Sequence, residues 1–121
     1  MANEIKTSIN CGVTNGTFRV RFNASITEDQ AVLGAEEGIV FVGTSEEDMP
    51  VGDVATNGVL LIFNHSTANF VVYGPKSGGS MIAFGRLNPG AFHYLRLQTG
   101  VTLRWAADTA QCKVEMHLLN N

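Results

Sequence analysis

Apolar and polar residues alternate along much of this chain, and the alternation predicts β-strands. Isoleucine, cysteine and valine alternate with polar residues from Glu4 to Val13, and the pattern resumes from Phe18 to Phe22 after the dipeptide Asn15-Gly16. A period of two places successive side chains on opposite faces of a strand, and Asn-Gly favours a tight turn. This first part of the chain therefore predicts a hairpin of two half-buried strands.

The most apolar stretch runs from Val59 to Tyr73. Two nearly continuous runs of apolar residues flank the polar hexapeptide that spans Asn64 to Asn69. Such runs predict a second, central hairpin whose strands are covered on both faces. Since a chain of 121 residues has little left to cover the outer face, the pattern also predicts contact with another subunit.

Two stretches are less regular. From Ile26 to Gly38 charged and small residues predict a loop or a short edge strand, and a short buried strand follows up to Gly43. From Thr44 to Asn57 we expect mainly a loop. Within it, Thr44 or Ser45 followed by Glu46, Glu47 and Asp48 could cap one helical turn before Pro50.

The last third repeats short alternating strands between turn signals. We expect turns at Pro75 to Ser80, Asn88-Pro89-Gly90 and Thr99-Gly100, a strand from Met81 to Leu87, and a final strand from Cys112 to Leu118. Eight or nine short strands with a turn every ~8 to 12 residues, and no helical periodicity, predict an all-β fold. The expected architecture is a single antiparallel β-sandwich of jelly-roll type over residues 1–121.

Composition and charge narrow the classes of partner. With 45% apolar and 16% charged residues the chain is globular, and its net charge of −3 does not favour nucleic acid as a partner. Acidic residues concentrate before Leu60 and basic residues after it, so neighbouring copies could attract each other, although solvated loops are the commoner explanation. The start lacks a signal peptide and no run reaches the ~20 apolar residues of a membrane span, which predicts a soluble protein that is not secreted and has no membrane partner.

No chemical motif emerges. The three histidines lack metal-ligand spacing, and the turn at Ser77 to Ser80 lacks the lysine and the following helix of a phosphate loop. We therefore predict no catalytic residue, no metal site, no cofactor and no enzymatic activity. Cys11 and Cys112 both occupy apolar positions of alternating strands, which favours two buried free thiols and leaves a disulfide between terminal strands open.

Aromatic residues concentrate in the second half of the chain, where most should form the core. Aromatic side chains close to arginines also suit a subunit interface, and a sugar-binding platform would use similar rings. The candidate interface residues are Phe70, Tyr73, Arg86, Tyr94 and Arg96, together with Glu46 and Glu47.

A series of short phrases, in a fixed order, covers roughly Val42 to Leu119. These phrases are Asn69-Phe70-Val71-Val72, Leu87-Asn88-Pro89-Gly90, Leu95-Arg96-Leu97 and Ala107-Asp108-Thr109-Ala110. In their order and spacing the chain resembles small virion proteins of tailed bacteriophages.

The resemblance implies a jelly-roll particle component without enzymatic activity. On this basis we expect a homotrimer, made in the host cytoplasm, that decorates or cements the exterior of a phage capsid. Its expected partners are its own copies and the major capsid protein, and nucleic acid is not among them. The alternative is a tail or neck module that binds host glycans.

Overall fold

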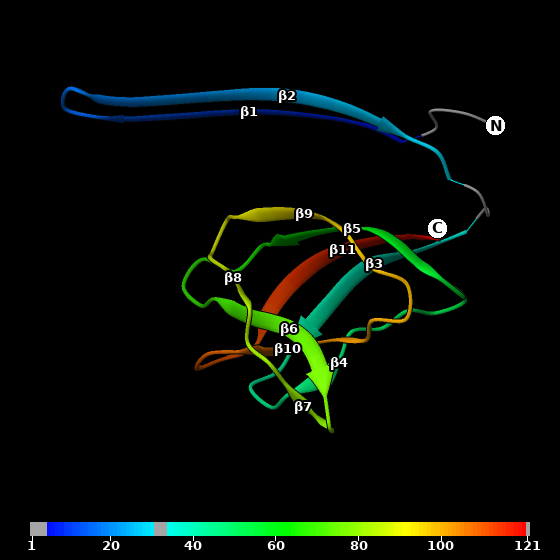
Figure 1. Ribbon diagram of the computed structural model, residues 1–121. Helices are drawn as coiled ribbons and strands as arrows, with labels where there is room; N and C mark the ends of the chain where they lie inside the picture. The colour runs from blue at the N-terminus through cyan, green and yellow to red at the C-terminus, as the bar shows by residue number, and fades with distance from the viewer. Residues whose placement is uncertain (1–4, 31–33, 121) are drawn as a thin grey trace. The chain divides into compact units, whose positions relative to one another are not determined.

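The computed structural model describes residues 5–30 and 34–120 (Figure 1). These residues form eleven strands, β1 to β11, and include no helix. The chain divides into two compact units, Met1–Ala31 and Val32–Asn121. The all-β prediction is confirmed, with more strands than the eight or nine expected. All strands of the sandwich lie in the second unit, whereas the sequence analysis placed one sandwich over residues 1–121.

The first unit is a long antiparallel hairpin. Strands β1 (Ile5–Asn15) and β2 (Phe18–Glu28) pair without a break, from Ile5 opposite Glu28 to Asn15 opposite Phe18. Gly16 opens the two-residue loop with a φ of 59°, as both common types of tight hairpin turn, I′ and II′, require of their first central residue. The predicted hairpin is confirmed. It is longer than expected, because β2 continues through residues 26–28, which the sequence analysis assigned to a loop or a short edge strand.

The second unit is a sandwich of two antiparallel sheets. One sheet has the order β3-β11-β5-β9, and its strands are Ala35–Val42, Cys112–Asn120, Asn57–Asn64 and Phe92–Arg96. The other sheet has the order β4-β10-β6-β7, with β8 also paired to β6. Its strands are Glu47–Asp48, Leu103–Ala107, Val71–Ser77, Ser80–Met81 and, for β8, Gly85–Leu87.

The path of the chain through these sheets is that of a jelly roll. Successive strands alternate between the sheets, except that β6, β7 and β8 follow one another within the second sheet. The first and last strands of the unit, β3 and β11, are neighbours in the first sheet. Two sheets built from interlocking Greek keys define the jelly roll. The predicted antiparallel sandwich of jelly-roll type is therefore confirmed.

The predicted central hairpin from Val59 to Tyr73 is wrong. β5 pairs with β11 and β9, whereas β6 pairs with β10 and β8 in the other sheet. The connection from β5 to β6 crosses between the two sheets, and the fully buried Asn64 stabilises it. Its Nδ2 donates to the carbonyl oxygens of Asn69 at 2.9 Å and of Leu87 at 3.1 Å. The long apolar run reflects a central strand, so it is no longer a reason to expect another subunit.

Shorter elements also depart from expectation. Glu47–Asp48 form β4 against β10 instead of a helical turn, because Arg104 on β10 binds the acidic side chains of this segment. The predicted strand from Met81 to Leu87 is reduced to its two ends, β7 and β8. The Asn88-Pro89-Gly90 turn is confirmed: the Ala91 amide donates to the Asn88 carbonyl at 3.0 Å, and φ of Gly90 is 74°.

The core lies between the two sheets of the sandwich. Alternate residues of β10 and β11 point inward as predicted, and Trp105 is fully buried against the inward side chains of the opposite sheet. The prediction for the cysteines is half right: Cys112 is buried, but Cys11 is exposed on the hairpin. Both are free thiols.

Candidate functional site

The outer face of the β3-β11-β5-β9 sheet carries a mixed apolar and charged surface. Strand register aligns one row of Ile39, Glu115, Phe63 and Phe92, and a second row of Glu37, His117, Leu61 and Tyr94. Ile39 is 47% exposed, Phe41 58% and Phe92 63%. Large apolar side chains gathered on one exposed face mark a surface that contacts something else.

Two histidines flank a carboxylate at the centre of this face. Oε1 of Glu115 lies 2.9 Å from Nε2 of His65, and Oε2 lies 2.6 Å from Nε2 of His117. The second ring nitrogen of His117, Nδ1, lies 3.3 Å from Oε2 of Glu37. We call these four residues the Glu115 cluster.

Two members of the Glu115 cluster, Glu115 and His117, favour their charged states. The hydrogen bond to Glu115 raises the pKa of His117, and hydrogen bonds from His117 and then His65 lower the pKa of Glu115. Because both ring nitrogens of His117 face carboxylates, the doubly protonated imidazolium satisfies both. The cluster therefore places a pH-sensitive group in the middle of an exposed apolar face.

A shallow depression adjoins the cluster. Its volume is about 310 Å³, and Leu61, Phe63 and Phe92 line it beside Glu115 and His117. An apolar, partly aromatic surface with a few polar groups is typical of the core of a protein interface. The outer face is therefore the best candidate for a contact surface on the sandwich.

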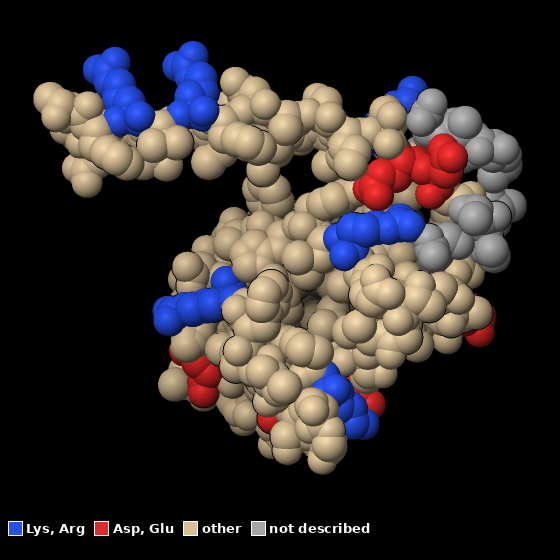
Figure 2. Space-filling model, in the orientation of Figure 1, with Lys and Arg blue, Asp and Glu red and all other residues tan. Residues whose placement is uncertain are grey.

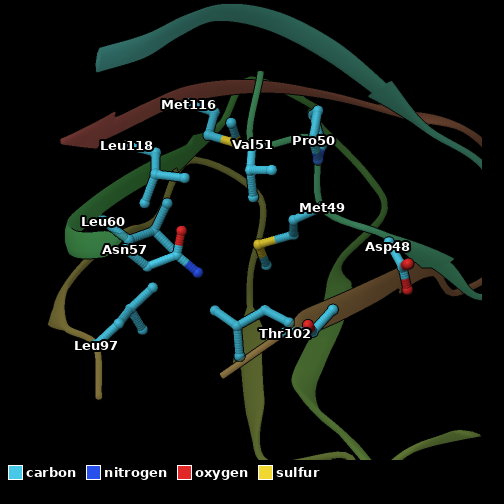
Figure 3. A pocket seen from close by; sticks show the side chains of 11 residues that line it. Asp48, Met49, Pro50, Val51, Asn57, Leu60, Leu97, Thr102, Met116 and Leu118 are labelled. Carbon is cyan, nitrogen blue, oxygen red and sulfur yellow. The ribbon is translucent and has the colours of Figure 1, made fainter. Parts of the chain in front are cut away.

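A second hollow, of about 420 Å³, opens between the two sheets. Figure 3 shows Leu60, Leu97 and Leu118 on one side of it and Met49 across the space. Its size fits a small ligand, but a ligand pocket also needs converging polar groups to orient its ligand. Here Nδ2 of Asn57 already donates to the carbonyl of Val101 at 2.9 Å. This hollow is therefore the weaker candidate.

The acidic segment around β4 forms ion pairs within the sandwich. Arg104 donates from Nε to Asp48 Oδ1 at 2.7 Å and from Nη1 to Glu46 Oε1 at 2.9 Å. The Met81 amide also donates to Glu46 Oε1, at 2.6 Å. The hydrogen bond from Arg104 lowers the pKa of Asp48. Of the two predicted interface acids, Glu46 is thus bound within the chain, and Glu47 is exposed on β4.

The prediction of Tyr73 as an interface residue is wrong. Its side chain is only 2% exposed, because it points inward from β6. Its hydroxyl lies 2.6 Å from Nδ1 of His93, which points inward from β9 in the opposite sheet. Burial raises the pKa of Tyr73 and lowers that of His93, so both are held neutral at the core.

The other predicted aromatic and basic residues fall into two groups. Tyr94 and Arg96 lie on β9 with Phe92, on the candidate face. Phe70 and Arg86 belong elsewhere: the guanidinium of Arg86 stacks at 3.6 Å over the Phe70 ring, beside β6 and β8. The sequence analysis did not predict the Glu115 cluster. Its outward positions on the last strand were visible as polar residues of an alternating pattern. The strand that contributes Glu37, β3, and the segment after β5 that contributes His65 could not be recognised as its neighbours.

Comparisons with known proteins add no family. No protein-family model, no curated protein and no solved structure matches this chain. Among residues 5–30 and 34–120, no group of three or more His, Cys, Asp or Glu side chains is arranged to hold a metal ion. Within those same ranges no helix is long and apolar enough to span a membrane.

Proposed function

We propose that this protein is a structural accessory protein of a tailed-phage virion, which decorates or cements the capsid exterior as a homotrimer. The observation that carries the proposal is the outer face of the β3-β11-β5-β9 sheet, where Ile39, Phe41 and Phe92 are exposed around the Glu115 cluster. The short turn and strand motifs of this chain resemble those of small virion proteins in their order, and this resemblance supports a role in a phage particle. Jelly rolls occur in capsid proteins, and also in lectins and enzymes, so the fold is only an analogy.

A cement protein acts by adding contact area between neighbouring capsomers. A shell that binds it gains stability by mass action, since the bound protein favours the assembled state over the disrupted one. The task needs a rigid scaffold and a surface that fits the shell. The sandwich supplies the scaffold, and the apolar outer face supplies a surface that a partner can desolvate.

Particles that lack the protein test this role. They should assemble, but rupture and release DNA at a lower temperature than complete particles, and added purified protein should restore the difference. Phe92→Ser should abolish rebinding, because Phe92 is 63% exposed on the outer face. Phe84→Ser is the matched control, since Phe84 is also exposed, at 72%, but lies between β7 and β8 beside the other sheet.

Two outcomes would contradict the proposal. If electron microscopy of intact particles finds the protein only on the tail or neck, the tail module becomes the better explanation. If the protein belongs to no particle and binds a defined sugar, a lectin-like function replaces it. Equal loss of rebinding in both phenylalanine variants would remove the outer face from the contact.

A further inference from the structure

The β1–β2 hairpin, which we call the ribbon, is amphipathic along its whole length. Directly paired residues of an antiparallel ribbon share a face, so the register divides the side chains into two sets. One face is mostly apolar and holds Ile5, Ile9, Cys11, Val13, Phe18, Val20, Phe22, Ala24 and Ile26. The same face carries Thr7, and its two ends carry Asn15 and Glu28. The opposite face is polar and holds Lys6, Ser8, Asn10, Gly12, Thr14, Arg19, Arg21, Asn23, Ser25 and Thr27.

The apolar face is open to solvent. Six of its large apolar side chains are between 43% and 61% exposed, and they are Ile9, Val13, Phe18, Val20, Phe22 and Ile26. A two-stranded hairpin alone is marginally stable in water, and it needs a further layer on its apolar side. The polar face needs no such cover, since hydroxyl groups such as Ser8 and Ser25, 3.2 Å apart, pair across its strands. The apolar face of the ribbon therefore favours contact with another molecule, whereas the polar face favours water.

We propose that the apolar face of the ribbon packs against the same face of another copy of this chain. This contact is two-fold and is separate from the three-fold contact of a homotrimer. The proposal therefore goes beyond the role in a particle, and it does not depend on that role. The first argument is area. Eleven residue pairs make a ribbon about 37 Å long and about 10 Å wide. Each face covers about 370 Å², so stacking two of them buries roughly 700 to 1,000 Å² in total, which reaches the lower limit for a specific protein contact.

The second argument is the distribution of charge. Lys6, Arg19 and Arg21 lie on the polar face, which carries no acidic residue. Figure 2 shows basic side chains that stand out from one side of the ribbon. When two apolar faces stack with sheets ~10 Å apart, the polar faces point away from each other. The like charges then lie roughly 20 Å apart, beyond the ~8 Å over which salt screens them at physiological ionic strength.

A lipid surface is the alternative occupant, because an amphipathic element that lies on a membrane also carries basic residues on its polar face. Recognition of anionic lipids uses clusters of about 4 to 8 lysines and arginines. The polar face of the ribbon carries three basic residues, Lys6, Arg19 and Arg21. Another ribbon is therefore the better occupant, since it covers the apolar face and leaves these charges in water.

Cys11 provides a direct test of the contact. It lies on the apolar face, one position beyond the midpoint of β1, and it is exposed, whereas Cys112 is buried. In a symmetric stack the midpoints of two ribbons lie near the symmetry axis, so two Cys11 thiols fall within reach of a short linker. The side chains of both faces point into the ~10 Å gap between the stacked sheets, so the two thiols lie closer together than the backbones. A bismaleimide with a linker shorter than ~10 Å should therefore join copies of the purified protein through Cys11. Cys11→Ser should abolish the product.

Two adjacent positions on opposite faces provide the matched variants. Phe22→Ser removes an exposed aromatic side chain from the apolar face, and we expect at least a thirty-fold weaker self-association by light scattering, as for the loss of an interface anchor. Arg21→Ser truncates the neighbouring side chain on the polar face and should leave association unchanged. The double variant Val13→Thr with Val20→Thr replaces a directly opposed pair by isosteric β-branched residues, so strand propensity is kept while the face becomes polar. It should also weaken association and cross-linking.

Several outcomes would overturn the proposal. A monomer at every concentration, without a Cys11 cross-link, would mean that no second copy covers the face. Equal association of the Phe22→Ser and Arg21→Ser proteins would place the contact elsewhere. Binding to anionic phosphatidylserine vesicles that is lost in Phe22→Ser would make lipid the occupant. Because these experiments use purified protein alone, their failure is distinct from a failure of the particle experiments.

Discussion

Strand β2 of the ribbon and strand β11 of the sandwich have the same pattern and opposite environments. Both alternate apolar and polar residues, but β11 alternates between buried and more exposed positions, whereas nearly every residue of β2 is exposed. A period of two sorts side chains onto two faces. Whether a face is then covered depends on distant parts of the chain or on another molecule.

The two strands also contribute to different equilibria. Val114 of β11 is fully buried, so its apolar surface already stabilises the folded monomer. Phe22 of β2 is 56% exposed, and much of its surface remains available to drive association. Mutations in the two strands should therefore separate folding from assembly.

The sharpest test of this separation uses the largest side chain of the core. Trp105→Ala should lower the free energy of unfolding by about 3–5 kcal/mol, because it leaves a large cavity in a fully buried position. Phe18→Ala on the ribbon, where the ring is 61% exposed, should change it by less than about 0.5 kcal/mol in dilute monomer. Denaturant unfolding followed by circular dichroism measures both. Equal losses would mean that the ribbon is part of the cooperative core.

A smaller effect tests the register of the sandwich. Leu103→Ala should cost about 2–4 kcal/mol, and Val114→Ala less, because both side chains point into the core. Lys113→Ala, one position away on the outer face, should stay within about 0.5 kcal/mol. A cost at Lys113 similar to that at Val114 would show that the inward and outward faces are exchanged.

The adjacent residues Glu46 and Glu47 differ in their contacts, so the same substitution at the two positions can be compared. Glu46→Lys should lower the melting temperature at low salt, because it brings a cation beside Arg104 and removes an acceptor of the Met81 amide. Glu47→Lys, on an exposed side chain, should change it little. The difference should shrink as salt is added, since exposed charges are screened. Only Glu47→Lys then tests a contact of this segment with a capsid without disturbing the sandwich, and unchanged rebinding would exclude that contact.

The smallest expected effect concerns pH. The pKa of His117 is raised above 6.5 in the folded protein, so its pairing stabilises the fold at pH values below 6.5 and is lost as pH rises through the raised value. The pKa of Glu115 is lowered below 4.5, so its contribution is present above 4.5 and is lost as pH falls through the lowered value. The melting temperature of the parent protein should exceed that of His117→Gln most between about pH 4.5 and 6.5. A constant difference from pH 5 to 9 would contradict this.

The local pattern of apolar and polar residues was sufficient to predict which side of a strand points inward and where turns lie. It was not sufficient to predict which strands pair. The inward residues of β10 and β11 and the Asn88-Pro89-Gly90 turn were predictable, since period two and positive φ are local properties. The link from β5 to β6 was misread as a hairpin, because strand pairing is decided by residues far away in sequence. For the same reason His117 and Glu115 were visible as outward residues, whereas their contact with His65 was not.

Trp105 is the only tryptophan of the chain and it is fully buried in the sandwich, with no hydrogen-bond partner for its indole nitrogen among the described residues. An indole in such a dry, apolar setting should emit blue-shifted fluorescence that moves to the red when the sandwich opens. The ribbon strands contain no tryptophan. Fluorescence excited selectively at the indole therefore reports the unfolding of the sandwich alone. The far-ultraviolet circular dichroism signal, in contrast, reports the strands of both units. A mismatch between the two optical transitions would reveal, without any label, a ribbon that melts separately from the jelly roll.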